Sequence, residues 1–91
     1  MAERTVFFVS DQTGVTVETL GHSLLTQFEK VEFNLITVPF VDSLGKAEQV
    51  TERINRTASQ SGLRPIVFTS FVQDEVRAPL LSCNGLILDF F

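Results

Sequence analysis

The residues best suited to chemistry in this 91-residue chain lie together in the segment SDQTGVT, residues 10–16. An apolar run precedes the segment and a helical apolar period follows it, so it joins a strand to a helix. Its hydroxyls, carboxylate and glycine suit a phosphate or substrate site, because free N–H groups at a helix N-terminus attract anions. Ser, Thr and Asp are equally the ordinary turn and capping residues, so both roles stay open. We expect Thr13 to cap the helix, which leaves Asp11 unexplained by capping.

Further polar side chains follow the other predicted strands. In an open parallel sheet, ligands bind beyond the carboxyl ends of the strands. The candidate phosphate or substrate residues at that edge are Asp11, Thr13, Gly14, Thr16, Asp42, Ser43, Thr69 and Ser70. For the last four of these, turn and capping roles are favoured over ligand binding. Asp11 could hold a metal ion, accept a proton or bind a substrate hydroxyl, but it would repel a phosphate that no cation accompanied.

Several sharper motifs are absent from the sequence. Neither the dinucleotide fingerprint G-x-G-x-x-G nor the P-loop G-x-x-x-x-G-K-[ST] occurs. His22 is the only histidine, and we expect it to pair with Glu18 one helical turn before it. Cys83 is the only cysteine, and we expect it to pack at a helix end. We therefore expect no metal site, and the catalytic residues stay unknown.

The periodicity of the apolar residues predicts an alternating order of strands and helices. Strands are expected at residues 5–10, 33–41, 65–70 and 86–91, and helices at 14–29, from Asp42 or Ser43 to about residue 60, and at 72–82. This β-α-β-α-β-α-β order predicts an α/β fold with an open parallel sheet, as in one half of a Rossmann or flavodoxin-like domain. Residues 1–91 are expected to form an N-terminal α/β domain or part of one, because three helices leave such a sheet short of cover.

Individual residues sharpen this expectation. The first helix should bury Val17, Leu20, Gly21, Leu24 and Phe28, with Leu25 at the edge of the stripe and Gly21 allowing a close approach to a strand. The second helix should bury Leu44, Ala47, Val50, Thr51, Ile54 and Ala58, and it should end at Gly62. Glu52 and Arg56 are spaced to form an ion pair on that helix. Pro79 should bend or end the third helix.

Composition and charge exclude several classes of protein. The net charge is −4 and the basic residues are dispersed, which disfavours a nucleic-acid surface. No secretory signal precedes the first strand, and no apolar run is long enough to span a membrane. A lone cysteine fits a reducing compartment. We therefore expect a cytoplasmic protein that contacts neither nucleic acid nor membrane.

A longer pattern gives the chain a family resemblance. The stretch SDQTGVTVETLGHSLLTQF is similar to a family opening of the form S-D-x-T-G-x-T-A-E-x-L-G-x-S-L-L-x-Q-F. The matching residues are Ser10, Asp11, Thr13, Gly14, Thr16, Glu18, Leu20, Gly21, Ser23, Leu24, Leu25, Gln27 and Phe28. Val17 stands where that family has Ala, and the likeness continues through PFVDS, RPIVFTS and NGLILDFF. The chain thus resembles the N-terminal segment of the regulatory proteins of phosphoenolpyruvate synthase and pyruvate,phosphate dikinase.

The resemblance implies a bifunctional regulator. Such proteins phosphorylate a threonine of their target with ADP as donor, and they remove that phosphate with inorganic phosphate, releasing pyrophosphate. The family's P-loop lies beyond residue 91, so the resemblance implies that this chain alone is inactive and binds no cofactor. The alternative is a non-catalytic recognition or dimerisation module, whose apolar surface near residues 86–91 pairs with a second copy or with another domain.

Overall fold

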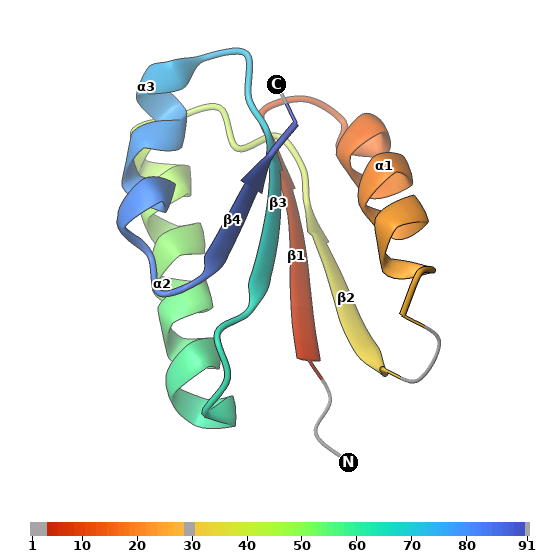
Figure 1. Cartoon of the computed structure of the whole chain (residues 1–91). Coiled ribbons are helices and arrows are strands. Elements are labelled where there is room, and N and C mark those ends of the chain that lie inside the picture. Colours follow the sequence, from red (N-terminus) through yellow and green to blue (C-terminus); the bar gives the residue numbers. More distant parts are fainter. Residues whose placement is uncertain (1–3, 29–30, 91) are drawn as a thin grey trace.

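The computed structural model describes residues 4–28 and 31–90, which form a sheet with helices on both faces (Figure 1). The strands are β1 (Arg4–Ser10), β2 (Phe33–Val38), β3 (Ile66–Ser70) and β4 (Leu86–Asp89). The helices are α1 (Val15–Leu25), α2 (Leu44–Ser61) and α3 (Asp74–Arg77), and the 3₁₀ helix η1 (Ala78–Ser82) continues α3. The predicted alternation of strands and helices is therefore confirmed.

The four strands are all parallel and lie in the order β2-β1-β3-β4. Phe8 lies beside Thr37 of β2 and Phe68 of β3, so β1 is a central strand. From β1 the chain moves to one side of the sheet, to β2, and it then moves to the other side, to β3 and β4. That order is the one of flavodoxin-like folds, and it places the topological switch point at the carboxyl ends of these two strands.

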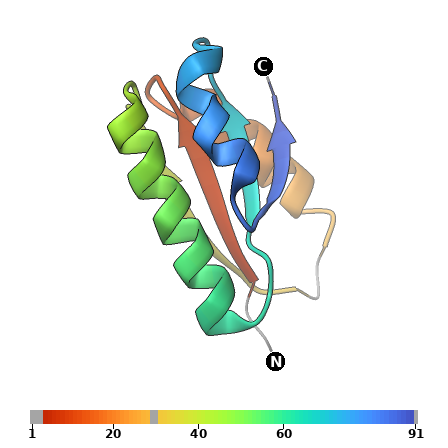
Figure 2. The same ribbon diagram turned by 90° about the vertical axis from the view of Figure 1, so that its left-hand side faces the viewer.

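The reversal decides which helices cover which face. The connection from β1 to β2 crosses the sheet in the opposite direction to the next two connections. Crossovers of one hand therefore place α1 on one face and place α2, α3 and η1 on the other (Figures 1 and 2). The sheet is covered by two helical segments on the second face and by a single helix on the first.

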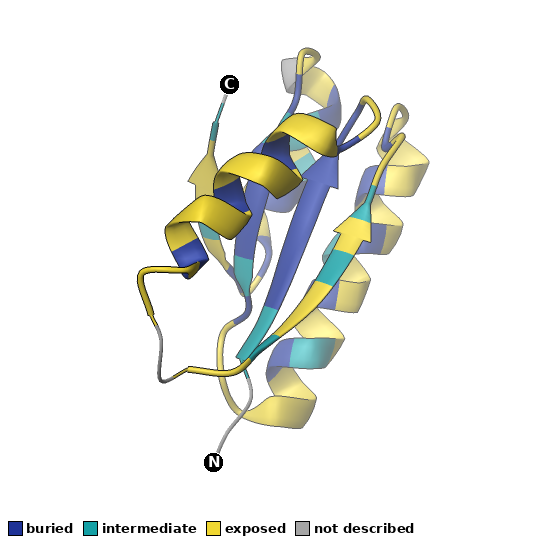
Figure 3. Ribbon diagram, turned by 90° about the vertical axis from the view of Figure 1, so that its right-hand side faces the viewer, coloured by how far each residue is buried: buried dark blue, intermediate teal, exposed yellow. Residues whose placement is uncertain are grey.

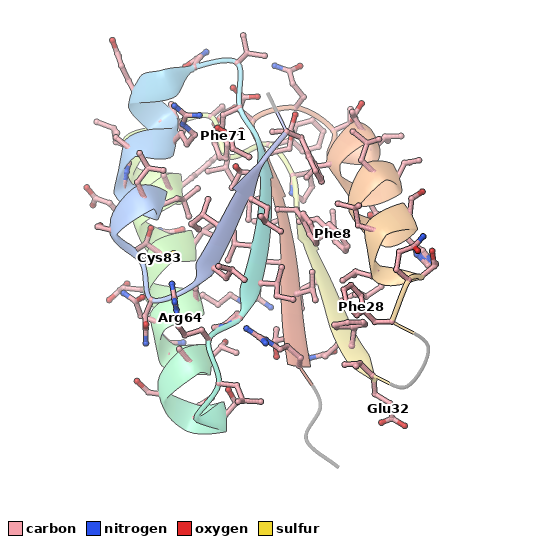
Figure 4. All side chains as sticks on the ribbon, viewed as in Figure 1. Phe8, Phe28, Glu32, Arg64, Phe71 and Cys83 are labelled. Carbon is pink, nitrogen blue, oxygen red and sulfur yellow. The ribbon has the colours of Figure 1, made fainter. Side chains whose placement is uncertain are left out.

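The sheet divides the hydrophobic core into two clusters, and the cluster on the α2 face is the larger one. On the α2 face the buried cluster includes Phe7, Val9, Val41, Ala47, Val50, Ile54, Val67, Phe71, Val76, Leu80 and Cys83. On the α1 face the cluster includes only Val6, Phe8, Val17, Leu25 and Phe68 among the described residues. Cys83 is buried beside η1, as expected, and burial raises the pKa of its thiol. Figure 4 shows Phe71 and Cys83 on the α2 side and Phe8 on the α1 side.

Some predicted element bounds were too long. β2 ends at Val38 instead of residue 41, because Pro39 has no N–H for the sheet ladder. α1 ends at Leu25, and β4 ends at Asp89; residues 29 and 91, which the predictions included, lie outside the described residues. The third helix is α-helical only over Asp74–Arg77 and becomes 3₁₀ at Ala78, next to Pro79, as its proline predicted.

The predicted inward residues of the helices were partly wrong. On α1 the buried side is Val17, Gly21 and Leu25, whereas Leu20, Leu24 and Phe28 are exposed. On α2 the predicted Ala47, Val50, Ile54 and Ala58 are buried, but Leu44 at the first helical position is exposed. Ser43 caps α2 by accepting the N–H of Lys46 at 3.3 Å, and Gly62 ends it with a positive φ of 74°. No ion pair joins Glu52 and Arg56 in the described structure. Both side chains are exposed, and an exposed ion pair gains little over the entropy that it costs to fix two long side chains.

Gly21 is the closest point of approach between α1 and the sheet. A Cβ atom at this position would lie 2.4 Å from Cε1 of Phe8 and 3.1 Å from Cδ2 of Phe68. Both rings are buried and stacked with their centroids 5.6 Å apart, so neither can move aside easily. The predicted close approach is confirmed, and it fixes the distance of α1 from β1 and β3.

We expect Gly21→Ala to destabilise the chain by about 1–3 kcal/mol, although alanine is the better helix former, because the methyl group overpacks the core. Gly45→Ala is the matched control, since Gly45 also lies in a helix but has open space around its Cβ position. The control should stabilise by up to about 1 kcal/mol. Urea unfolding of both variants measures the difference, and equal effects would contradict the close approach.

Candidate functional site

The carboxyl ends of the four parallel strands meet at one edge of the sheet, at the end of the molecule where α1 and α2 begin (Figure 1). Three loops lie there, at residues 11–14, 39–43 and 71–73. The first and third of these loops follow β1 and β3, so they flank the topological switch point. General experience with open α/β sheets makes this crevice the expected place for a ligand.

Asp11 occupies the space between the two switch-point loops. Its Oδ2 accepts hydrogen bonds from the backbone N–H groups of Val72, at 2.9 Å, and Gln73, at 3.0 Å. The residue is only 6% exposed. Its Oδ1 is also buried and has no hydrogen-bond partner in the described part of the chain. Asp11 therefore occupies two N–H donors that an anionic ligand could otherwise use. Its structural role is to join the loop after β1 to the loop after β3, and it does not cap α1.

The loop after β1 is also bonded to the loop after β2. Phe40 donates its N–H to the carbonyl of Gln12 at 2.8 Å, and Val41 donates to the carbonyl of Ser10 at 2.9 Å. Phe40 holds a positive φ of 58°, a conformation that costs a non-glycine residue about 1–3 kcal/mol. Ser10 is itself buried, and its Oγ accepts the N–H of Gln12. Residues 10–12 are therefore hydrogen-bonded to both of the other loops at this edge.

The first helix begins without a side-chain cap. Gly14, and not the predicted Thr13, occupies the N-cap position, with a φ of 85° that favours glycine. Thr13 lies one residue before the cap, and its Oγ1 reaches the N–H of Val15 only at 3.5 Å. Thr13 and Thr16 are both exposed. The N-terminus of α1 therefore presents two exposed hydroxyls and no carboxylate cap.

The other predicted site residues are spread along the edge. Asp42 forms an exposed ion pair with Lys46 at 2.9 Å, and the hydrogen bond from this ammonium lowers the pKa of its carboxyl group. Ser43 is the cap of α2. Thr69 is fully buried in β3, whereas Ser70 is half-buried at the end of that strand. A ligand at the edge could reach Thr13, Thr16, Asp42 and Ser43 directly, but Thr69 only after displacing packed side chains.

The edge lacks the phosphate-binding loop with which P-loop proteins hold a nucleotide. The sequence offers no P-loop, and the carboxylate of Asp11 fills the switch point. Within residues 4–28 and 31–90, no three His, Cys, Asp or Glu side chains gather in a way that could hold a metal ion. The residues present therefore do not fit ADP, and we assign no phosphoryl-transfer step to this edge.

A separate groove, which the sequence did not reveal, lies between α1 and β2. It has a volume of about 590 Å³ and is lined by Phe8, Glu18, Thr19, His22, Ser23, Thr26, Leu35 and Thr37. Glu18 accepts a hydrogen bond from the Thr37 hydroxyl at 2.7 Å, so its carboxylate turns toward β2. The predicted pairing of Glu18 with His22 was wrong for this reason, and the described residues show no ion pair between them.

Comparison with known proteins decides the family. The profile of the kinase/pyrophosphorylase family matches residues 6–91, which is nearly the whole chain. This chain belongs to the kinase/pyrophosphorylase family. A relative from Alkalilimnicola ehrlichii is 52% identical over 90 residues, covering 99% of this chain and 32% of the relative. A relative from Bordetella avium is 49% identical over 88 residues, covering 97% of this chain and 32% of the relative. A relative from Pseudomonas putida F1 is 47% identical over 89 residues, covering 98% of this chain and 33% of the relative.

These relatives carry the provisional name phosphoenolpyruvate synthase regulatory protein. The chain spans about a third of the length of each of these curated relatives. No solved structure matches it. In the described part of the chain, no helix combines the length and the apolar character that crossing a membrane requires.

We expect Asp11→Ala to lower the free energy of unfolding by about 2 kcal/mol or more, because two backbone N–H groups lose a charged, buried acceptor. Asp42→Ala is the matched control, since the Asp42–Lys46 pair is exposed and such pairs contribute at most about 1 kcal/mol. Chemical denaturation of both variants measures the difference. A loss at Asp11 no larger than the loss at Asp42 would contradict the bridging role.

Proposed function

We propose that this chain supplies the N-terminal α/β layer of a bifunctional regulator of phosphoenolpyruvate synthase or pyruvate,phosphate dikinase. The single observation that carries the proposal is the family match over residues 6–91. The names of the relatives support phosphoenolpyruvate synthase as the first target to test. The resemblance of SDQTGVTVETLGHSLLTQF supports both targets equally. Such a regulator would act in the cytoplasm, together with its target.

The proposed activity consists of two different phosphoryl transfers. In the first, a target threonine hydroxyl takes the terminal phosphoryl group of ADP, leaving AMP and releasing the hydroxyl proton. In the second, inorganic phosphate attacks the phosphothreonine and forms pyrophosphate, which restores the threonine. The first transfer inactivates the target and the second reactivates it.

We place the nucleotide site of this regulator outside residues 1–91. Phosphoryl transfer depends on backbone N–H groups and a lysine that cradle the phosphates, and this chain has no P-loop to supply them. Asp11 also fills the switch point with negative charge of its own. In this proposal the chain contributes a surface that positions the target or the incoming phosphate, not the groups that activate ADP.

The N-terminus of α1 is the most suitable part of the edge for that role. Thr13 and Thr16 are exposed there, and Gly14 leaves the helix end without a side-chain acceptor. The positive end of the helix dipole and two hydroxyl donors favour a phosphate or phosphothreonine. Asp42 and Ser43 lie at the start of α2 along the same edge and complete the proposed contact surface together with Ser70. Thr69 is buried beneath this surface and supports it without direct contact.

A chimera tests the proposed activity. This chain replaces the matching third of the Alkalilimnicola ehrlichii relative, and the unaltered relative serves as the control. We expect both proteins to transfer phosphate from radiolabelled ADP to phosphoenolpyruvate synthase, and we expect the 91-residue chain alone to transfer none. A chimera that melts cooperatively but stays inactive beside an active control would contradict the proposal, and so would activity of the isolated chain.

The same chimera tests the proposed contact surface. We expect Thr13→Ala with Thr16→Ala to reduce phosphorolysis by about tenfold to a hundredfold, which corresponds to the loss of hydrogen bonds to a charged group. The melting temperature should change little, because both side chains are exposed. Thr57→Ala on α2, away from the edge, is the control. Equal activity of the edge variant and the control would remove this surface from the proposed mechanism.

A further inference from the structure

The two long helices differ in the kind of surface that they present. α2 (LGKAEQVTERINRTASQS) carries Lys46, Glu48, Glu52, Arg53 and Arg56, which is typical of a helix with one face in water. α1 (VTVETLGHSLL) carries a single carboxylate, Glu18, and its remaining polar residues are hydroxyls and His22. A helix that is apolar or uncharged nearly all round is typical of an interior position. Yet most of the outer surface of α1 is exposed in this structure (Figure 3).

Apolar side chains extend this exposed surface from α1 onto the edge of the sheet. Glu18, His22 and Thr26 line the groove on the β2 side of α1. Leu20 and Leu24 lie on the other side of the buried line of α1, toward β3 and β4, and are 46% and 47% exposed.

On β4, Leu86 and Leu88 point to the same face as α1 and are 42% and 40% exposed. Phe90 follows them and stacks on Phe68 at 5.2 Å. We call the surface formed by Leu20, Leu24, Leu86, Leu88 and Phe90 the α1–β4 face.

The α1–β4 face extends past the part of the sheet that α1 covers. Neighbouring strands lie about 4.8 Å apart and packed helices about 8–10 Å apart, so one helix covers about two strands. α1 lies over β1 and β3, as the position of Gly21 against Phe8 and Phe68 shows. Within residues 4–28 and 31–90, β4 therefore lacks a covering helix on this face, whereas η1 and α2 cover its other side through Ile87. Parallel sheets are found with both faces covered.

The chemistry of the face and the comparisons indicate what covers it. The five residues are all apolar, so they fit a desolvated protein surface and not a small polar ligand. The part of each relative that this chain does not match is about twice as long as the part that it matches. A second copy is the less suitable occupant, because each copy carries a net charge of −4 and a net charge far from zero disfavours self-association.

We infer that the α1–β4 face is the docking surface for an amphipathic helix from the remaining two-thirds of these regulators. The helix lies beside α1 and covers Leu86 and Leu88, so that α1 becomes an interior helix. The inference goes beyond the proposed activity, because it concerns which surface joins this layer to the rest of the regulator and not which reaction the regulator performs.

Cysteine labelling tests the inference without an activity assay. Leu24→Cys and Leu88→Cys place a thiol on the α1–β4 face, and Leu44→Cys is the matched control on the opposite side, where Leu44 is 53% exposed. Iodoacetamide labelling at each position is followed by peptide mass spectrometry in the 91-residue chain and in chimeras with the remainders of the three relatives named above. Buried Cys83 provides an internal reference for a protected thiol.

We expect all three introduced thiols to react readily in the 91-residue chain. In the chimera, the thiols at positions 24 and 88 should react at least about tenfold more slowly, whereas position 44 should be unchanged.

Unchanged rates at positions 24 and 88 in a cooperatively melting chimera would overturn the inference. Protection that grows with the concentration of the 91-residue chain would overturn it too, because it would assign the face to a second copy. Failure of all three chimeras to melt cooperatively would count equally against it. An active chimera with unprotected thiols would refute the docking face alone, and a protected but inactive chimera would refute the activity alone.

Discussion

The carboxylate of Asp11 is the interaction on which the ligand edge depends. It is buried between the loops that follow β1 and β3 and accepts two backbone N–H groups of the second loop. The loop that carries it and the last residue of β1 each accept one backbone hydrogen bond from the loop after β2. One acidic side chain and its short loop thus hold the start of both long helices relative to the sheet. The switch point of the fold is consequently closed by the protein itself.

This constraint changes what the switch point of a flavodoxin-like strand order offers to a ligand. The strand order places the crevice between β1 and β3, and most such folds leave donors free there for a ligand. In this chain Asp11 takes two of the donors at the switch point, the N–H groups of Val72 and Gln73 in the loop after β3. What stays available is the uncapped start of α1 with Thr13 and Thr16, which is suited to a transient contact with a phosphate. The family membership and the closed crevice together favour a positioning layer over a catalytic one.

The sequence predicted what depends on local periodicity and missed what depends on tertiary geometry. The order of the elements, the cap at Ser43 and the end at Gly62 follow from residue types that act within one turn of chain. The partner of Asp11 lies more than sixty positions away, so no local pattern could reveal it. The cap of α1 was misplaced by one residue because Thr13 suits a cap chemically, whereas the backbone needs the positive φ of Gly14. Leu20 and Leu24 were predicted to be buried, and their exposure is the finding from which the docking face follows.

The central claim is that this chain carries no nucleotide site at its ligand edge, and a binding titration tests it most directly. The ¹H–¹⁵N spectrum of the 91-residue chain would be followed as ADP is added to about 1 mM, with and without Mg²⁺. At that concentration, binding with a free energy of about −4 kcal/mol would be detected. The account predicts no saturable shift in the amides of residues 10–14 and 71–73. Saturable shifts in both loops, reversed by excess inorganic phosphate, would contradict it.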